Sequence, residues 1–354
     1  MKIRGEEILF PTTIVGSYVR PFWLTGKIFS EGADAPEFES FRAREMYHDA
    51  VALAVKDMED AGLDIVTDGG QYYENETNYE YAGLFHYMAE RLEGYAPYGD
   101  RIKLHEFDLP IYKPTVLGPV RWKRPVFKPV LEAVQRATRK PIKINCSLGP
   151  ATLAALSTDR HYGGDVAALA MDVAAAYNQE FKDLEQRGVD MIQVTEPLPL
   201  HQLGPWIRDA INRAFEGISA YKVVHVCYGH EEGQPGILER RLHEILPLTH
   251  DLNVNMLHFE MSTHDFDEVE RFKDFPADKD LGVGVISPKS LVVERPQQIA
   301  DWILRTTRYV RPEQLCISTD CGMASFRRVV AFKKLKAMVE GTQLARAELT
   351  GVPV

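Results

Sequence analysis

Three apolar runs of the chain end on residues that could bind a metal ion. The candidates are His225 with Cys227, His258 with Glu260, and Asp320 with Cys321. Side chains two positions apart on a β-strand point to the same face, so each of the first two pairs would project together. A single cysteine in a strand is more often a small core residue. Three runs that all end on ligand types favour a metal site over that interpretation.

Four of these residues form a set that suits one metal ion. They are His225, Cys227, Glu260 and Cys321. Thiolates combined with an imidazole select zinc over magnesium or calcium, and four ligands of this kind suit a tetrahedral zinc. His258 precedes Glu260 by two residues and would be either a partner of a ligand or a packed core histidine.

The charge of such a ligand set indicates what the zinc would do. Two thiolates and a carboxylate bring negative charge to the metal, which makes it a weak Lewis acid for splitting water. The set suits a substrate thiol bound as thiolate, because the metal drives deprotonation of the thiol. The bound sulfur stays nucleophilic, so we expect alkyl transfer to sulfur. A hydrolase would more often have histidine-rich ligands and an open water position.

Short β-branched runs alternate with long amphipathic stretches along the chain. Eight such runs occur, at 12–17, 63–69, 142–146, 190–197, 222–227, 254–260, 282–287 and 315–321. Eight parallel β-α units favour a closed TIM (β/α)8 barrel, and we expect residues 1–354 to form this single catalytic domain. A doubly wound open sheet is the alternative, but no glycine-rich phosphate loop follows the first run. In a barrel the active site lies at the carboxyl ends of the strands, where the candidate ligands stand.

Three amphipathic stretches predict the clearest helices, at 41–62, 165–188 and 326–341. The second begins at Asp165, a good N-cap, and ends at Gly188. A further helix at 127–138 follows a segment that does not fit a minimal barrel. We expect that segment, 94–125, to be an inserted excursion such as a β-hairpin. Residues 20–40 form a long loop, and both segments follow early strands, where loops can roof an active site.

The composition is that of a globular enzyme and argues against several function classes. The chain of 354 residues has a net charge of −10 and a pI of about 5.6. It carries no basic stripe, so we expect no nucleic-acid partner. It has no apolar run of about 18 residues and no signal-peptide stretch at its start, so we expect a cytoplasmic protein without a membrane span. Four cysteines are too few for a disulfide framework, and we expect Cys146 and Cys316 in the core.

The motifs, taken together, resemble those of the catalytic half of cobalamin-independent methionine synthase over essentially the whole chain. The resemblance is carried by "PTTIVGSYVRP" at 11–21, "HVC" at 225–227, "FE" at 259–260 followed by Ser262, and "DCG" at 320–322. It implies a TIM barrel and a zinc cofactor. The ligands that it implies are His225, Cys227, Glu260 and Cys321, the same four that the chemistry selects.

The chain departs from the family pattern at positions that hold substrates. The family has two carboxylates that bind the amino group of homocysteine, and this chain has Gly70 and Thr195 at the matching positions. Glu196 and Gln71 are adjacent and can compensate. A buried ammonium group without an anionic partner is costly, so a thiol without an amine is an alternative acceptor. The methionine synthases also have a second barrel, whereas we expect one barrel here. They have a tryptophan that stacks on the pterin, where this chain has Ala154 and Ala155 nearby, and either Trp122 or Trp23 would replace it or serve in a loop or the core.

We expect five residues at the barrel mouth to bind substrate. They are Ser17, Arg20, Gln71, Thr195 and Asn145. Ser17 resembles the family serine whose neighbourhood holds the amino acid. The guanidinium of Arg20 suits a carboxylate or sulfonate, or else it forms a structural salt bridge.

Three further residues are candidates for catalysis. Lys289 lies near the position of a family histidine that moves a proton, so it would protonate a leaving group or else be a solvated loop lysine. Asp68 and Glu196 end the second and fourth runs, and acids at a barrel mouth are usually functional.

The sequence thus favours zinc-dependent transfer of an alkyl group, most simply a methyl, to a small thiol. The donor would be a methylated folate or a methyl corrinoid protein. One alternative resembles epoxyalkane:coenzyme M transferase, in which a zinc thiolate opens an epoxide without folate or amine recognition. A second alternative is a barrel without catalysis that holds folate or corrinoid for a partner, and the zinc-competent ligands argue against it. The sequence leaves a homo-oligomer open.

Overall fold

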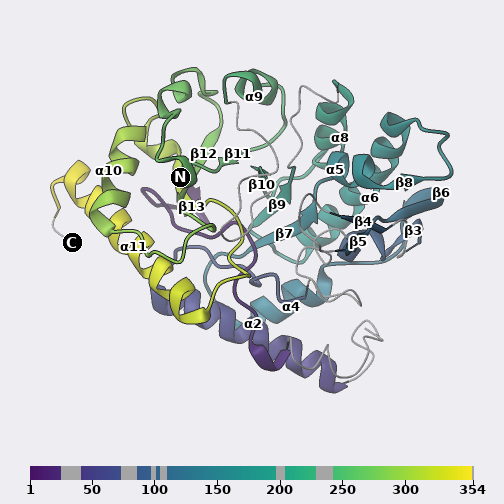
Figure 1. Cartoon of the computed structure of the whole chain (residues 1–354), viewed down its shortest axis with the longest axis horizontal. Helices are drawn as coiled ribbons and strands as arrows, with labels where there is room; N and C mark the ends of the chain where they lie inside the picture. The colour runs from purple at the N-terminus through teal and green to yellow at the C-terminus, as the bar shows by residue number, and fades with distance from the viewer. Residues whose placement is uncertain are drawn as a thin grey trace.

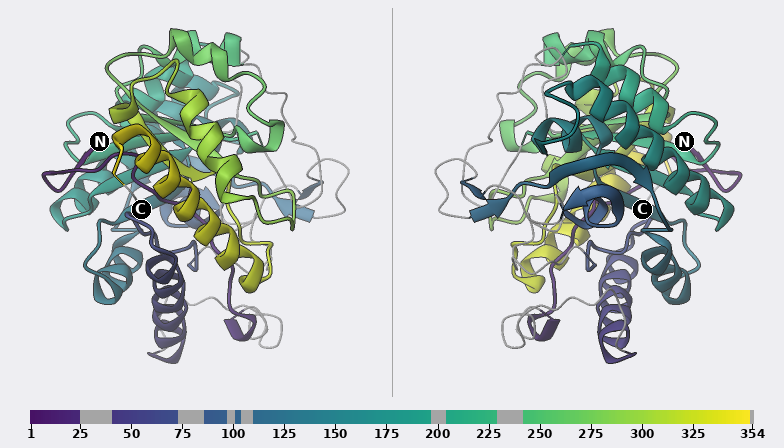
Figure 2. Two further views of the ribbon diagram at one scale, coloured as in Figure 1. Left: turned by 90° about the vertical axis from the view of Figure 1, so that its left-hand side faces the viewer. Right: turned by 90° about the vertical axis from the view of Figure 1, so that its right-hand side faces the viewer.

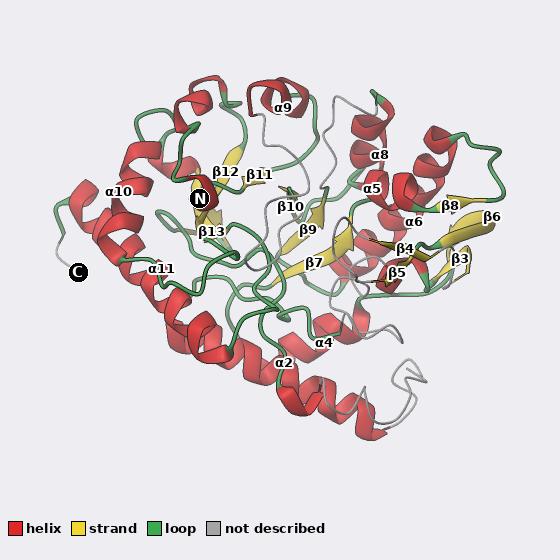
Figure 3. Cartoon of the chain, viewed as in Figure 1, coloured by secondary structure: helices red, strands yellow, loops and turns green. Residues whose placement is uncertain are grey.

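A curled parallel β-sheet lies at the centre of the molecule, with helices packed around it (Figures 1 and 3). The computed structural model describes residues 1–24, 41–72, 86–96, 101–103, 110–196, 204–228 and 242–352. The sheet consists of β7 (Lys143–Leu148), β9 (Met191–Thr195), β10 (Tyr221–Val226), β11 (Met256–Phe259), β12 (Asp280–Ile286) and β13 (Leu315–Thr319). These strands follow one another around the sheet in chain order, and each neighbouring pair is parallel.

The first two predicted strands complete the ring through one bridge each. Thr12 pairs with Ile317 of β13, and Val66 pairs with Ile142 just before β7, both in parallel. The two segments also join each other, since the Ile65 N–H donates to the Thr12 carbonyl at 3.0 Å. All eight predicted runs therefore take their places in a TIM-type barrel, which confirms the predicted fold class.

The sequence predicts strands at 12–17 and 63–69, but in the structure neither run forms a regular strand. The Asp64 carboxylate accepts hydrogen bonds from the Thr12 N–H and hydroxyl, both at 2.9 Å. The Thr12 hydroxyl in turn accepts from the Asp64 N–H at 3.0 Å. Because these side chains take backbone partners, the ladder between the two segments does not extend further.

The helices surround the sheet on its outer face (Figure 3). They are α2 (Phe41–Ala61), α4 (Lys128–Ala137), α5 (Pro150–Leu156), α6 (Val166–Gln186), α8 (Trp206–Ala214), α9 (Leu242–Thr249), α10 (Pro296–Thr306) and α11 (Arg328–Thr350). Three short 3-10 helices join them: η1 (Ser262–His264), η2 (Val269–Asp274) and η3 (Pro312–Gln314). Within the described ranges, none of the helices has the length and apolar character needed to cross a bilayer.

The ends of the predicted helices are largely confirmed, with one exception. Asp165 caps α6 by accepting from the Ala168 N–H, and Gly188 follows the helix with φ +82°. The helix predicted at 326–341 instead runs on to Thr350 as α11. Gly341 lies inside this helix, and a Cβ at this position would lie 2.6 Å from Ile299 Cβ of α10. This glycine therefore permits close packing of two helices rather than a stop.

The excursion predicted at 94–125 is a β structure attached to the side of the barrel. β3 (Leu92–Ala96) and β6 (Thr115–Trp122) pair antiparallel, and β6 also pairs with β8 (Thr158–Asp159). Between them, β4 (Arg101–Lys103) and β5 (Pro110–Tyr112) form a hairpin that projects from the molecule (Figure 2). Residues 25–40 of the predicted long loop lie outside the described residues.

The N-terminus covers the amino-terminal end of the barrel strands. β1 (Lys2–Ile3) and β2 (Glu6–Glu7) form a small hairpin. Met1 and Ile3 belong to a buried apolar cluster with residues from the barrel interior, and these are Ile65, Met191, Val223, Met256 and Cys316. Cys316 is fully buried, as is Cys146, so both are core residues as predicted.

Candidate metal centre

Four potential metal ligands converge at the carboxyl ends of three barrel strands. His225 lies on β10, while Cys227, Glu260 and Cys321 follow β10, β11 and β13 within two residues. Their ligand atoms all lie within 4.8 Å of one another. His225 and Glu260 are fully buried, Cys227 is almost so, and Cys321 is partly exposed. The four residues selected from the sequence are therefore brought together, and one side of the cluster is accessible.

The separation of the two thiols suits a shared metal. The Sγ atoms of Cys227 and Cys321 lie 3.5 Å apart. A disulfide would require about 2.05 Å. Two sulfurs bound to one tetrahedral zinc at about 2.3 Å each stand about 3.8 Å apart. The chemistry and spacing of the donor set therefore fit zinc.

A second histidine holds the imidazole of His225. The parallel register places His225 opposite His258, and their Nδ1 atoms lie 2.7 Å apart. Burial, followed by the proximity of His225 and Lys143, keeps the pKa of His258 well below its usual value. Because Nδ1 of His225 contacts His258, Nε2 is the ring nitrogen that would bind a metal. Of the two roles open to His258 in the sequence, the structure therefore places it as the partner of a ligand.

Asp320 is not a member of the ligand cluster, although it precedes Cys321. Its carboxylate is fully buried and accepts hydrogen bonds from the segment that follows Glu260. Burial and the nearby Glu260 raise the pKa of Asp320. Glu260 itself accepts a hydrogen bond at Oε1 from the Tyr228 N–H at 2.9 Å. The sequence does not predict these contacts of Asp320, because their donors lie almost 60 residues away in the chain.

Ser17 and Arg20 lie in the loop after the first barrel segment. Ser17 contacts the metal-ligand motif, since a Cβ at Gly322 would lie 2.1 Å from Ser17 Oγ. The Ser17 carbonyl also accepts from the Met323 N–H at 2.9 Å. Arg20 donates through Nη2 to the Gly70 carbonyl at 3.0 Å. The first loop is thus fixed against both the second loop and the segment that carries Cys321.

Asp68 and Gln71 form a pair of buried acceptors at the end of the second segment. Both side chains are almost fully buried, and within the described residues neither carboxylate oxygen of Asp68 nor Oε1 of Gln71 has a well-formed hydrogen bond. Burial raises the pKa of Asp68 to about 7, although Arg20 and neighbouring backbone amides oppose the shift. Gln71 is held by its amide, which donates to the Gly69 carbonyl at 3.0 Å. Both side chains therefore retain acceptor capacity for a bound molecule.

Glu196, a candidate for catalysis, accepts hydrogen bonds from the start of α5. Its carboxylate accepts from the N–H groups of Ala151 and Thr152, at 3.2 and 2.9 Å, and from the Thr152 hydroxyl. Burial raises the pKa of Glu196 to about 7. Thr195 and Asn145 lie beside it on β9 and β7, with the Thr195 hydroxyl 3.5 Å from Asn145 Oδ1. Glu196 thus has a structural task that the sequence did not reveal.

Lys289 lies in the loop after β12, close to the carboxylates of the metal centre. Burial lowers the pKa of Lys289, while Glu260 and Asp320 oppose the shift. The loop is anchored from outside the barrel, because Glu294 accepts from the Ser287 N–H at 2.9 Å and pairs with buried Lys334 at 2.8 Å. The backbone that carries Lys289 is therefore fixed relative to the barrel.

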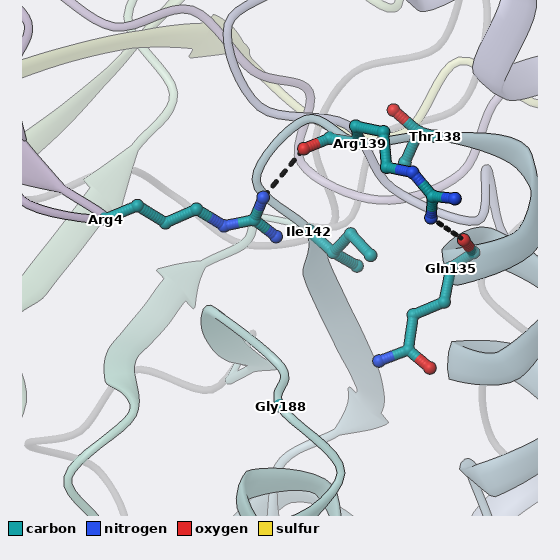
Figure 4. Close-up of a pocket in the computed structure, with 6 residues that line it drawn as sticks. All are labelled: Arg4, Gln135, Thr138, Arg139, Ile142 and Gly188. Atoms are coloured by element: carbon teal, nitrogen blue, oxygen red, sulfur yellow. Dashed lines mark hydrogen bonds between the residues drawn. The ribbon is translucent and has the colours of Figure 1, made fainter.

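A separate pocket lies at the opposite, amino-terminal end of the barrel strands (Figure 4). It is lined by Arg4, Gln135, Thr138, Arg139, Ile142 and Gly188. Arg4 pairs with Asp190 at 2.7 Å and donates to the Arg139 carbonyl at 2.7 Å. Its guanidinium therefore fastens the N-terminal hairpin to the barrel.

Comparison with known proteins relates the whole chain to one family. The family described as "Cobalamin-independent synthase, Catalytic domain" matches residues 10–344. A methionine synthase of Saccharolobus solfataricus is 31% identical over 346 residues, which cover 96% of each chain. One from Sulfurisphaera tokodaii is 32% identical over 348 residues, covering 97% of this chain and 95% of the relative.

Solved structures agree with this relationship. A B12-independent methionine synthase from a Shewanella species, in complex with selenomethionine, superposes with a TM-score of 0.84 at 27% identity. The superposition covers 98% of this chain and all of the other. A putative enzyme of the same kind from Listeria monocytogenes shares the fold, with a TM-score of 0.68 at 18% identity. The chain belongs to the family of cobalamin-independent methionine synthase catalytic domains.

Proposed function

We propose that this protein is a zinc-dependent methyltransferase whose acceptor is a small thiol, with residues 1–354 forming one catalytic barrel. The observation that carries the proposal is the cluster of His225, Cys227, Glu260 and Cys321, whose ligand atoms lie within 4.8 Å of one another. The mixture of two thiols, one imidazole and one carboxylate selects zinc. Membership of the methionine synthase family supports methyl transfer as the reaction.

These four residues would hold the zinc, which would bind the acceptor sulfur as a thiolate at neutral pH. The partly exposed side of the cluster, at Cys321, gives a thiol access to the site. His258 keeps the His225 ring in place through the 2.7 Å contact between their Nδ1 atoms.

The mouth residues would bind the rest of the acceptor. Asp68 and Gln71 offer buried acceptor atoms for a group that donates hydrogen bonds, such as an amine. Ser17, Thr195 and Asn145 would bind other polar groups of the acceptor. The selenomethionine bound by the Shewanella relative supports an amino-acid thiol, and therefore homocysteine, as the acceptor.

Lys289 would act on the methyl donor. As the methyl group moves to sulfur, the bond between the methyl carbon and the donor atom breaks, and a folate leaves as a nitrogen anion unless it receives a proton. An ammonium group whose pKa is lowered by burial is suited to supply that proton. A methylated folate is the donor that uses this residue, whereas a methyl corrinoid protein needs no proton on its leaving cobalt.

A thiol titration of the zinc-loaded protein, followed by X-ray absorption at the zinc edge, tests the proposal. Homocysteine, coenzyme M and a simple alkanethiol would be compared. Sulfur coordination should rise from two to three with homocysteine at concentrations that leave the other thiols unbound. If none of the three thiols changed the coordination of the zinc, thiol activation would be refuted.

An epoxide-opening reaction like that of epoxyalkane:coenzyme M transferase is the second candidate. Gly70 and Thr195 favour it, because they replace the two carboxylates that bind an amine in the family. The single-barrel length does not favour it, since the matched methionine synthase of Saccharolobus solfataricus is covered over 96% of its own length. A rise in sulfur coordination with coenzyme M alone would select this alternative.

A further inference from the structure

The carboxylate of Asp320 connects two of the segments that carry metal ligands. Asp320 directly precedes Cys321, and its oxygens accept four hydrogen bonds from the turn after Glu260. The donors are the N–H groups of Met261 at 3.0 Å, Ser262 at 3.0 Å and Thr263 at 2.7 Å, and the Thr263 hydroxyl at 2.6 Å. These amides begin η1, so the carboxylate also satisfies the donors that a helix start leaves without partners.

The neighbouring strand leaves room for this carboxylate. A Cβ at Gly284 of β12 would lie 2.1 Å from Asp320 Oδ1 and 2.6 Å from its Cα. Any side chain at this position would therefore push the carboxylate, or the strand that carries it, out of place. Asp320 is fully buried in the resulting space, and water does not compete for its hydrogen bonds.

We propose that Asp320 is a positioning residue that fixes Glu260 and Cys321 relative to each other in the arrangement that zinc requires. The proposal rests on the proposed function only in taking zinc as the metal. Two ligands on separate strands need a rigid connection, because each can otherwise move with its own loop. Outer partners of metal ligands typically change metal affinity about 10-fold to 100-fold when they are replaced.

The test measures zinc affinity in Asp320→Asn, by competition with a chromophoric chelator added to the metal-free protein. An asparagine keeps the shape of the side chain but turns an NH2 group toward one of the two pairs of donors. We expect the dissociation constant for zinc to rise about 10-fold to 100-fold. We also expect the visible absorption of the cobalt-substituted protein to change, because the ligand arrangement is altered.

Asp190→Asn is the matched control. Asp190 is also a carboxylate that joins distant segments, since it accepts from Arg4 at 2.7 Å and from the Ile142 N–H at 2.8 Å, but it lies at the other end of the barrel. This variant should melt at a lower temperature and keep the zinc affinity of the unaltered protein. A role of Asp320 in general stability alone would make the two variants behave alike.

The outcomes separate this proposal from the proposed function. Zinc affinity in Asp320→Asn within about twofold of the unaltered protein, or an equal loss in Asp190→Asn, would overturn the positioning role alone. If Asp320→Asn does not fold, zinc affinity is measured in Thr263→Val instead, because this variant removes one donor to the same carboxylate. A rise of about threefold or more in its dissociation constant supports the role, and no rise overturns it. An unaltered protein that binds no zinc would overturn both proposals.

Discussion

Replacement of Asp68 by asparagine should make the protein more stable, and most strongly so above pH 7. The Asp68 carboxylate is 1% exposed and has no well-formed hydrogen bond to any residue that the structure describes. Its pKa rises by burial from an ordinary value of 3.8 to about 7. This rise in pKa corresponds to about 4 kcal/mol of unfolding free energy, at about 1.4 kcal/mol for each pKa unit.

The sign of the effect follows from which state binds the proton more tightly. Since the folded-state pKa is the higher one, the folded protein favours the protonated acid. The ionised group therefore destabilises the fold progressively as the pH rises from about 4 to 7, and by its full amount above pH 7. A neutral amide of the same shape removes this penalty. The gain should be about 4 kcal/mol at pH 8 and about 2 kcal/mol at pH 5.

Urea denaturation at pH 8 and pH 5 measures this gain. Asp64→Asn is the control on the same segment, because Asp64 accepts from Thr12 and pairs with Arg346 at 2.9 Å. That variant should lose about 1–3 kcal/mol. If Asp68→Asn were less stable than the unaltered protein at pH 8, or if its advantage did not change with pH, the carboxylate would have to be ionised and stabilised in the folded state. If the more stable variant lost methyl transfer, the reaction would require the Asp68 carboxylate that destabilises the fold.

Three further predictions test the metal site, the candidate acid and the attachment of the excursion. Cys227→Ser and Cys321→Ser should each lose most bound zinc and all transfer activity, as measured by elemental analysis and a methyl-transfer assay; full activity in either variant, or a similar loss in Cys316→Ala, would contradict the ligand assignment. Lys289→Met should lower kcat with a methylated folate by about 10²-fold to 10⁴-fold while thiol coordination stays intact; an unchanged kcat would exclude the proton-donor role. Glu180→Gln should lower the unfolding free energy by about 2–4 kcal/mol at unchanged zinc content, because this buried carboxylate accepts three hydrogen bonds at 2.8 Å from the end of β6 and the residues just before α4; a loss below about 1 kcal/mol in urea denaturation would contradict this account.

The metal cluster could be predicted because its geometry follows from local rules. His225 and Cys227 share a strand face through the two-residue alternation, and so do His258 and Glu260. Parallel strands of a barrel end at the same rim, which brings Cys321 to the same place. The register confirms this, since His225 lies directly opposite His258. Sequence spacing together with strand direction was sufficient here.

The tasks of Asp320 and Glu196 could not be predicted, because their partners are remote in sequence. Asp320 bonds to amides 57 to 59 residues before it, and Glu196 bonds to Thr152, 44 residues away. Backbone amides carry no signal in an amino-acid sequence. The shortness of the first two barrel segments was also missed, since it depends on side-chain bonds between Thr12 and Asp64 that compete with the ladder.

The glycines of β12 restrict how this barrel can acquire new specificities. A Cβ at Gly282 would lie 2.7 Å from the His258 ring, just as one at Gly284 would meet Asp320. A side chain at Gly282 would displace His258, which contacts His225. A side chain at Gly284 would displace Asp320, the proposed support of Glu260 and Cys321. Natural divergence and laboratory selection for another thiol must therefore act elsewhere on the rim. Asn145 and Thr195, on neighbouring strands β7 and β9, do not belong to the ligand cluster, so they are positions at which a library would test for a change of acceptor.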